Sequence, residues 1–218
     1  MSGTVHELRD WLLTEHWGTV DADRLTVLAE EMRGLVDAGV QGAVVELGCY
    51  RGAMALWMRA VLDGLDDVER EIHVYDSFRG LPNPGEYDSE HLRAGELVAS
   101  PQDVLAAHEL WGRRPPAIHP GWFQDTLPTG LPDTIAFAYL DGDYYESIRT
   151  SLRHCVPRLV VGGVLIIDDY ADATVNPRAW DGLPGVKRAC DDYFGHPSPI
   201  RVIAGDSDLA FGRHHRTA

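Results

Sequence analysis

Short apolar runs that are typical of buried strands alternate along the chain with segments in which apolar residues recur at helical spacing. We interpret as strands the runs 43–52, which continues into a turn, 72–76, 117–119, 134–140, the run that ends before Asp168, and two closing antiparallel segments, 200–204 and 208–212. Helical spacing covers 5–17, 21–38, 53–63, 101–110, 184–194 and the segment between the fourth and fifth strands. This alternation predicts an α/β fold with a parallel sheet.

The centre of this pattern is the stretch 136–170, which reads as strand, helix and strand. Its first apolar run ends in Asp141, and its second ends in Asp168 and Asp169. Parallel strands joined by a right-handed crossover end at one edge of the sheet, where ligands of open α/β sheets bind. Three carboxylates at one place repel one another unless a cation lies among them, and all-oxygen ligands suit a hard ion such as Mg²⁺. The alternative is that Asp168 or Asp169 caps the following turn.

A second candidate site is the loop that follows the first strand. Gly48 and Gly52 let the backbone approach a ligand, and the next helix points its N-terminal N–H groups toward it. The G-x-x-x-G spacing differs from the G-x-G-x-x-G of dinucleotide sites, and Glu46 suits an ammonium group better than a phosphate. Asp76 ends the second strand 24 residues after Gly52, where an acidic residue can accept hydrogen bonds from a ribose. Together these residues favour an adenosyl ligand.

Two loops add further candidates. The stretch 77–99 is rich in glycine, proline and charge, and long loops of compact domains often bind ligands. Trp122 and Phe123 lie in the turn 120–128, where their rings either sandwich an adenine or fill the core. We expect the terminal RHHRTA to be disordered and to have no metal role.

Composition narrows the class of partner. The 218 residues suit one α/β domain, and 34 acidic against 19 basic residues give a net charge of −15, which argues against nucleic acid or an anionic membrane. Lys187 is the single lysine, so lysine-based chemistry is largely excluded. Three widely spaced cysteines form no disulfide framework, and the chain has neither a secretory leader nor a run of 18 apolar residues. These features predict a cytoplasmic protein.

With these residues in hand, the sequence resembles the macrocin O-methyltransferase family of class I S-adenosylmethionine-dependent methyltransferases. The segments that carry the resemblance run in family order from about residue 40 to 195 and are VVELGCYRG (44–52), VYDSFRGLP (74–82), PGWFQDTLP (120–128), LDGDYYES (140–147), VGGVLIIDDY (161–170) and VKRACDDYF (186–194). Their combination is specific, although each one alone is a weak signal.

The resemblance implies a Rossmann-like fold with a seven-stranded, mostly parallel sheet and helices on both faces. It divides the chain into an N-terminal helical segment, 1–40, which serves as a cover or lid, and a methyltransferase domain, 41–218. It also implies Mg²⁺ or another divalent cation held by Asp141, Asp168 and Asp169. The residues that it assigns to S-adenosyl-L-methionine are Glu46, Gly48, Tyr50, Gly52, Asp76, Ser77, Phe78, Trp122, Phe123, Gln124 and Asp141.

The implied reaction is methylation of a hydroxyl group on a small natural product, with a sugar as the expected acceptor. Asp141 and Asp143 are the candidate proton acceptors, while Tyr144 or a histidine remains possible and Asp143 could instead cap the helix that follows. Catechol-type methyltransferases share the layout but carry a lysine base where this chain has Tyr144. The first 40 residues match the family poorly and are shorter than its usual N-terminal segment, so sugar specificity does not follow from the resemblance.

Two other interpretations of the function stay open, and a third is disfavoured. The acceptor could be a catechol or another vicinal phenol, and the protein could bind the cofactor without turnover and support a partner enzyme. A nicotinamide-dependent oxidoreductase is disfavoured because G-x-G-x-x-G is missing. From the family we expect a homodimer or higher homo-oligomer whose ligand is a glycoside or phenol, and no nucleic-acid or membrane partner.

Overall fold

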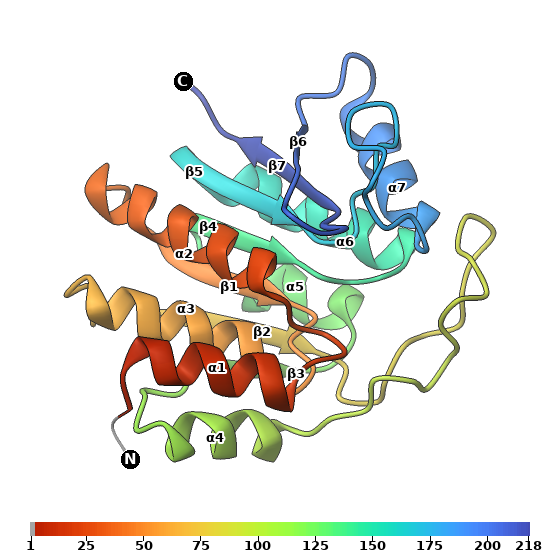
Figure 1. Cartoon of the computed structure of the whole chain (residues 1–218). Coiled ribbons are helices and arrows are strands. Elements are labelled where there is room, and N and C mark those ends of the chain that lie inside the picture. The colour runs from red at the N-terminus through yellow and green to blue at the C-terminus, as the bar shows by residue number, and fades with distance from the viewer. Residues whose placement is uncertain (1–2) are drawn as a thin grey trace.

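In the computed structural model, which describes residues 3–218, seven strands form one sheet in the order β3-β2-β1-β4-β5-β7-β6 (Figure 1). The strands are β1 (Ala43–Leu47), β2 (Ile72–Asp76), β3 (Ala117–Pro120), β4 (Ile135–Leu140), β5 (Leu159–Ile167), β6 (Arg201–Ile203) and β7 (Phe211–His215). β7 runs antiparallel to its neighbours β5 and β6, whereas the other paired strands are parallel. The predicted seven-stranded, mostly parallel sheet is therefore confirmed.

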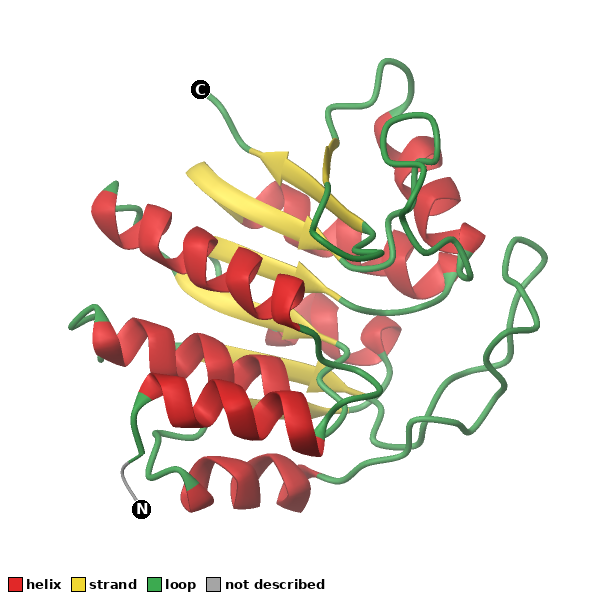
Figure 2. Ribbon diagram, in the orientation of Figure 1, coloured by secondary structure: helices red, strands yellow, loops and turns green. Residues whose placement is uncertain are grey.

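Helices cover both faces of this sheet, as Figure 2 shows. One layer contains α1 (Val5–Glu15), α2 (Ala22–Asp37), α3 (Ala53–Gly64) and α4 (Pro101–Leu110), and the other contains α5 (Phe123–Gly130), α6 (Tyr145–Cys155) and α7 (Pro184–Phe194). A short 3₁₀ helix, Val156–Arg158, joins α6 to β5.

The strands have apolar residues on both sides because both faces of the sheet are covered. Alternate residues of one strand enter opposite cores: Phe137 and Tyr139 of β4 pack with the α1–α4 layer, and Ala138 and Leu140 pack with the α5–α7 layer. All four side chains are fully buried. Register in the centre of the sheet is therefore fixed, since a slip of one residue would exchange the two faces.

The N-terminal helices belong to the same core as the rest of the chain. Leu8, Leu12, Leu25 and Leu28 are fully buried in the α1–α4 layer, and the indole N–H of Trp57 donates to the carbonyl of Leu25 at 2.7 Å. This segment is thus a packed cover of the sheet in the described residues; Met1 and Ser2 lie outside them.

Two local predictions were wrong. The expected turn at 120–128 contains the helix α5, whose first turn forms because the carbonyl of Trp122 accepts hydrogen bonds from the N–H groups of Asp125 and Thr126. Pro128 lies near the end of that short helix, where little of the helix remains to be disrupted. The expected disordered tail also begins inside a strand, because β7 extends to His215 and pairs with β5.

The site follows from the strand order. β1 pairs with β2 on one side and with β4 on the other, so the chain reverses its direction of winding between β1 and β4. Ligands of open α/β sheets bind beyond the carboxyl ends of the strands at such a switch point. In Figure 1 the arrows of the parallel strands point toward the side where the loop 77–99 lies.

Candidate active site

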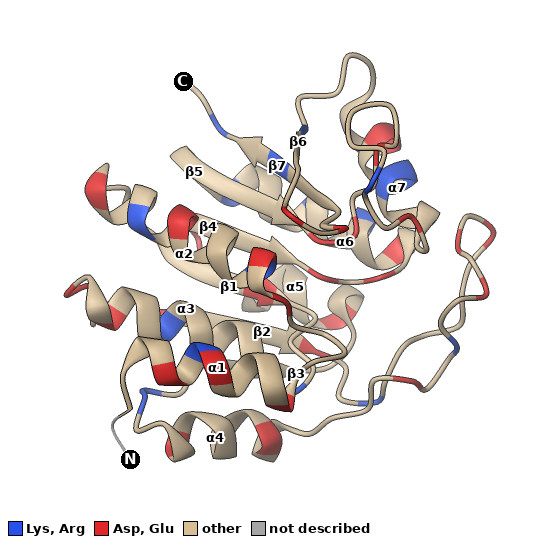
Figure 3. Cartoon of the chain, viewed as in Figure 1, with Lys and Arg blue, Asp and Glu red and all other residues tan. Residues whose placement is uncertain are grey.

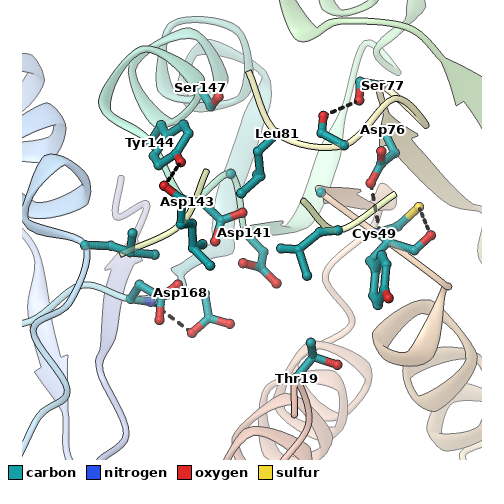
Figure 4. Close-up of a pocket in the computed structure, with 18 of the residues that line it drawn as sticks. Thr19, Cys49, Asp76, Ser77, Leu81, Asp141, Asp143, Tyr144, Ser147 and Asp168 are labelled. Carbon is teal, nitrogen blue, oxygen red and sulfur yellow. Dashed lines mark hydrogen bonds between the residues drawn. The ribbon is translucent and has the colours of Figure 1, made fainter. Parts of the chain in front are cut away.

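A cavity of about 860 Å³ opens beyond the carboxyl ends of β1, β2, β4 and β5. Figure 4 shows Asp141 in its middle, with Asp143 and Asp168 to one side and Asp76 and Cys49 to the other. The volume falls within the range of ordinary small-molecule sites. The cavity can therefore be described in three parts: a β1–β2 end, an acidic centre and a far end beside α2 and the loops 77–99 and 171–183.

At the β1–β2 end the chain takes left-handed turns that bring the backbone against the cavity. Gly48 has φ +93°, and a Cβ built on it would lie 1.8 Å from the carbonyl oxygen of Asp141, so only glycine fits between β1 and β4. Tyr50, with φ 46°, donates its N–H to a carboxylate oxygen of Asp76 at 2.8 Å. The loop after β1 is thereby fixed to the end of β2.

Asp76 accepts a second backbone hydrogen bond, from the N–H of Phe78 at 2.8 Å. Burial raises the pKa of its carboxyl group, and the hydrogen bonds from Phe78 and Tyr50 oppose that shift. Each carboxylate oxygen has a second lone-pair position. Asp76 is therefore fixed in orientation while it can still accept hydrogen bonds from a diol in the cavity.

Glu46 is the most deeply buried acid of this end, with 1% of its surface exposed, and it lines the cavity. Its Oε2 atom has no hydrogen-bond partner among the described residues. Burial, and then the nearby charge of Asp76, raise the pKa of this carboxyl to about 8. A buried acceptor without a partner is costly, so the site suits a ligand that brings a cationic donor to Glu46.

The acidic centre contains Asp141, Asp143 and Asp169, each of which offers a carboxylate oxygen within 4.8 Å of the others. Asp143 (φ 58°) and Asp169 (φ 57°) adopt the left-handed conformation, which is uncommon for residues other than glycine. Burial followed by repulsion from Asp168 raises the pKa of all three carboxyls, that of Asp143 to about 7. Such clustered oxygen donors fit a hard divalent cation.

Asp168 lines the same cavity but is not a member of this group. Its two oxygens accept hydrogen bonds from the Nε and Nη2 atoms of Arg24, at 3.0 and 2.9 Å, and from the hydroxyl of Tyr139. The structure thus brings together Asp141 and Asp169 of the expected metal-binding trio, adds Asp143, and pairs the third member with an arginine of α2. No sequence motif pointed to Arg24, because its contact with Asp168 joins residues 144 positions apart.

The other expected cofactor residues divide into two groups. Most of them line the cavity. Besides the residues already described, these are Ser77, Trp122, Phe123 and Gln124. Phe123 also packs against the α5–α7 core, so its ring fills part of the core as well as lining the cavity. Gly52 and Phe78 do not line the cavity. Gly52, with φ +80°, makes room for Val104 of α4, and Phe78 packs against the α1–α4 core.

The loop 77–99 borders the far end of the cavity and is fixed to the start of α6 and to the loop 171–183. Asp88 accepts a hydrogen bond from the N–H of Tyr145 at 2.8 Å, and the hydroxyl of Tyr144 donates to the carbonyl of Leu92 at 2.9 Å. His91 contacts the ring of Trp180 edge-on, with centroids 5.1 Å apart. Lining residues of this end that the sequence did not indicate are Thr19, Val20, Trp180, Leu183 and Asp208.

Comparison with known proteins decides the family. Residues 6–188 match the family described as macrocin O-methyltransferase (TylF). The chain belongs to this family. As a macrocin O-methyltransferase family member it is an S-adenosylmethionine-dependent O-methyltransferase, and the resemblance drawn from the sequence motifs is confirmed.

Two curated relatives come from Streptomyces. The 8-demethyl-8-(2,3-dimethoxy-α-L-rhamnosyl)-tetracenomycin-C 4′-O-methyltransferase of Streptomyces olivaceus is 36% identical over 94% of this chain and 78% of its own. The demethyldecarbamoylnovobiocin O-methyltransferase of Streptomyces niveus is 34% identical over 86% of this chain and 71% of its own. Among solved structures, the O-methyltransferase NovP aligns with a TM-score of 0.75 and 31% identity over 90% of this chain and 80% of that one.

Three further observations bear on the environment of the protein. Within residues 3–218, no helix has both the length and the apolar character needed to cross a bilayer. Cys49, Cys155 and Cys190 are buried and free. Basic residues are interspersed with acidic ones along the helices in Figure 3, in keeping with the net charge of −15.

Proposed function

We propose that this family member methylates a hydroxyl group on the sugar of a small glycosylated natural product, with a divalent cation, Mg²⁺, at its acidic centre. The observation that carries the proposal is the placement of Asp141, Asp143 and Asp169 in the same cavity as Glu46 and Asp76. The choice of a sugar as acceptor is supported by the name of the Streptomyces olivaceus relative, which contains a rhamnosyl group. The free cysteines are consistent with a reducing compartment, and we infer the cytoplasm.

The cofactor would lie across the β1–β2 end. We assign the ammonium of its methionine part to Glu46 and the ribose diol to Asp76, because one is an unpartnered buried acid and the other a fixed acceptor. Trp122, Phe123 and Gln124 would border the adenine. These positions direct the sulfonium methyl group toward Asp141, at the boundary with the acidic centre.

At the acidic centre, Asp141 and Asp169 would hold the cation, since Mg²⁺ is commonly bound through one or two carboxylates with the remaining positions left to water or substrate oxygens. The ion would lower the pKa of a coordinated acceptor hydroxyl. We assign the role of proton acceptor to Asp143, because it is the third member of the cluster and its pKa of about 7 suits a general base. The transfer forms a bond between the acceptor oxygen and the methyl carbon and breaks the bond from that carbon to sulfur.

The acceptor would occupy the far end of the cavity. There Trp180, Leu183 and Val20 provide apolar surface, while Thr19 and Asp208 provide polar groups. A sugar ring presents hydroxyls at its rim and C–H groups on its faces, so this mixture suits it. The same end would also contact the aglycone.

The test is a direct assay of transfer. The protein is incubated with methyl-labelled S-adenosylmethionine, Mg²⁺ and one of three acceptors, namely an α-L-rhamnosyl tetracenomycin C, its fully O-methylated form, and catechol. We expect mass spectrometry to find label in the first alone. Label in catechol alone would replace the sugar with a phenol, and cofactor binding without labelling of any acceptor would favour the catalytically silent partner.

A further inference from the structure

Arg24 is the basic residue that enters the acidic centre, and it comes from the N-terminal segment. It lies in the first turn of α2, lines the cavity and has 19% of its side chain exposed. Its guanidinium makes two hydrogen bonds to Asp168, and its Nη2 atom is 3.5 Å from a carboxylate oxygen of Asp169. Asp21, which caps α2, pairs with the Nη1 atom of Arg24. The arginine is therefore held on both sides.

Four hydrogen bonds, two of them from Arg24, occupy the acceptor positions of Asp168. Its Oδ1 atom accepts from Arg24 and from the N–H of Asp169 at 2.9 Å, and its Oδ2 atom accepts from Arg24 and from the hydroxyl of Tyr139. A carboxylate has about four lone-pair positions, so Asp168 has none left for a cation. In contrast, the carboxylates of Asp141 and Asp143 accept no hydrogen bond from the described residues. Their oxygens are therefore available to an ion.

The charges lead to the same conclusion. Asp141, Asp143, Asp168 and Asp169 carry four negative charges when ionised, and Arg24 is the positive group that touches them among the described residues. Burial is the largest single influence on the pKa of Arg24 and lowers it, but the combined attraction of Asp168, Tyr139 and Asp169 raises this pKa overall, so the guanidinium stays charged at every physiological pH. A fixed positive charge beside a site for a divalent ion weakens the binding of that ion.

We infer that Arg24 is a built-in counter-cation that competes with the divalent ion for Asp168 and Asp169, so that the first turn of α2 sets the metal affinity of the active site. The inference rests on the metal requirement of the proposed function. While Arg24 is in place, the ion is bound without Asp168. When Arg24 withdraws, Asp168 becomes free to act as a further ligand. Metal binding and the contact between α2 and Asp168 are thereby coupled: each weakens the other.

The test measures the binding of Mn²⁺ alone, from the electron paramagnetic resonance signal of the free ion. Arg24→Met removes the charge and keeps the length of the side chain, and we expect Mn²⁺ to bind about tenfold more tightly or better. Arg33→Met, at an exposed position of the same helix, changes the net charge equally and controls for it; its affinity should stay within about twofold of wild type.

Asp168→Asn distinguishes competition from a purely structural role. It should lower Mn²⁺ affinity in both backgrounds because it removes a nearby negative charge, and the loss should be at least about tenfold larger in the Arg24→Met background, where Asp168 also serves as a ligand. Equal effects of Asp168→Asn in both backgrounds, or unchanged affinity in Arg24→Met, would overturn the inference and leave the metal requirement standing. Failure of every variant and of wild type to bind Mn²⁺ would instead overturn both.

A wild-type measurement covers the case in which Arg24→Met does not fold. In protein labelled with ¹⁵N-arginine, the side-chain Nε–H signal of Arg24, identified from its absence in Arg24→Lys, should move when Mg²⁺ is added. The signal of Arg33 should not move. An Arg24 signal unaffected by saturating Mg²⁺ would show that the ion and the guanidinium do not compete.

Discussion

Replacing Glu46 with glutamine tests the assignment of the cofactor's ammonium group. The carboxyl of Glu46 has a pKa of about 8 because it is buried and lies near Asp76. At pH 6.5 this carboxyl is therefore mostly protonated, while the α-amino group of a ligand, with a pKa near 8, is charged. An ion pair between them requires Glu46 to lose its proton. Binding should thus release about one proton per molecule of cofactor.

Calorimetry measures that proton directly. S-adenosylhomocysteine is titrated into the protein at pH 6.5 in buffers that differ in ionisation enthalpy. The observed binding enthalpy is plotted against the ionisation enthalpy of the buffer, and the slope gives the number of protons exchanged on binding. We expect a release of about one proton in wild type and about zero in Glu46→Gln, with affinity weakened by about 2–5 kcal/mol through loss of one partner of a buried ion pair. Equal proton release by the two proteins would refute the assignment.

The same residue affects the stability of the cofactor-free protein in a predictable direction. The folded-state pKa of Glu46 lies above 4.5, the ordinary value for a glutamate. Its contribution to stability is therefore fully present below about 4.5 and is lost as pH rises through about 8, because the unfolded chain releases this proton first. Glu46→Gln should accordingly melt at a higher temperature than wild type at pH 8, with a smaller difference at pH 5. A constant difference across this range would contradict the high pKa.

Four further predictions concern the rest of the site. Asp76→Asn should weaken S-adenosylhomocysteine binding by tenfold or more while leaving Mn²⁺ affinity within about twofold, and equal losses of both would count against the ribose role. Mn²⁺ affinity of wild type should increase with pH around neutrality, because the pKa values of Asp141, Asp143 and Asp169 are all raised, that of Asp143 to about 7, and protons compete with the ion; Asp143→Asn should remove only part of that dependence in the same resonance assay. Trp180→Ala should raise KM for the glycoside without changing cofactor affinity by calorimetry; an unchanged KM would remove Trp180 from the acceptor end. Gly48→Ala should lower the free energy of unfolding by at least about 2 kcal/mol, since its Cβ meets a backbone oxygen, whereas Gly34→Ala, where a Cβ meets nothing within 4 Å, should raise it by about 0.5–1 kcal/mol in urea unfolding.

The sheet was predictable from the sequence because both of its faces are buried. The central strands β1, β2 and β4 lie where their apolar runs placed them, and Asp76 and Asp141 follow at their carboxyl ends. Continuous apolar runs bounded by glycine or acidic residues are typical of parallel strands. The edge of the sheet was less predictable: the run 208–212 is shifted to Phe211–His215, since β7 is a polar strand whose pairing with β5 outweighs its composition.

The acidic centre was predictable only in part, for a physical reason. Strand ends locate Asp141, Asp168 and Asp169 at one edge of the sheet, but they do not determine where each carboxylate points. That depends on the left-handed backbone of Asp143 and Asp169 and on a guanidinium that arrives from a helix 144 residues earlier in the chain. The lining residues of the far end were equally hidden, because Trp180 and Asp208 lie on separate loops without regular spacing.

The most direct measurement of the central claim is a crystal of the full chain soaked with S-adenosylhomocysteine and Mn²⁺, with anomalous data collected at the manganese edge. We expect one anomalous peak within about 2.0–2.3 Å of carboxylate oxygens of Asp141 and Asp169, with the sulfur of the ligand in the same cavity and its ammonium beside Glu46. A manganese peak elsewhere, or a ligand bound outside the cavity between Glu46 and Asp76, would contradict the account.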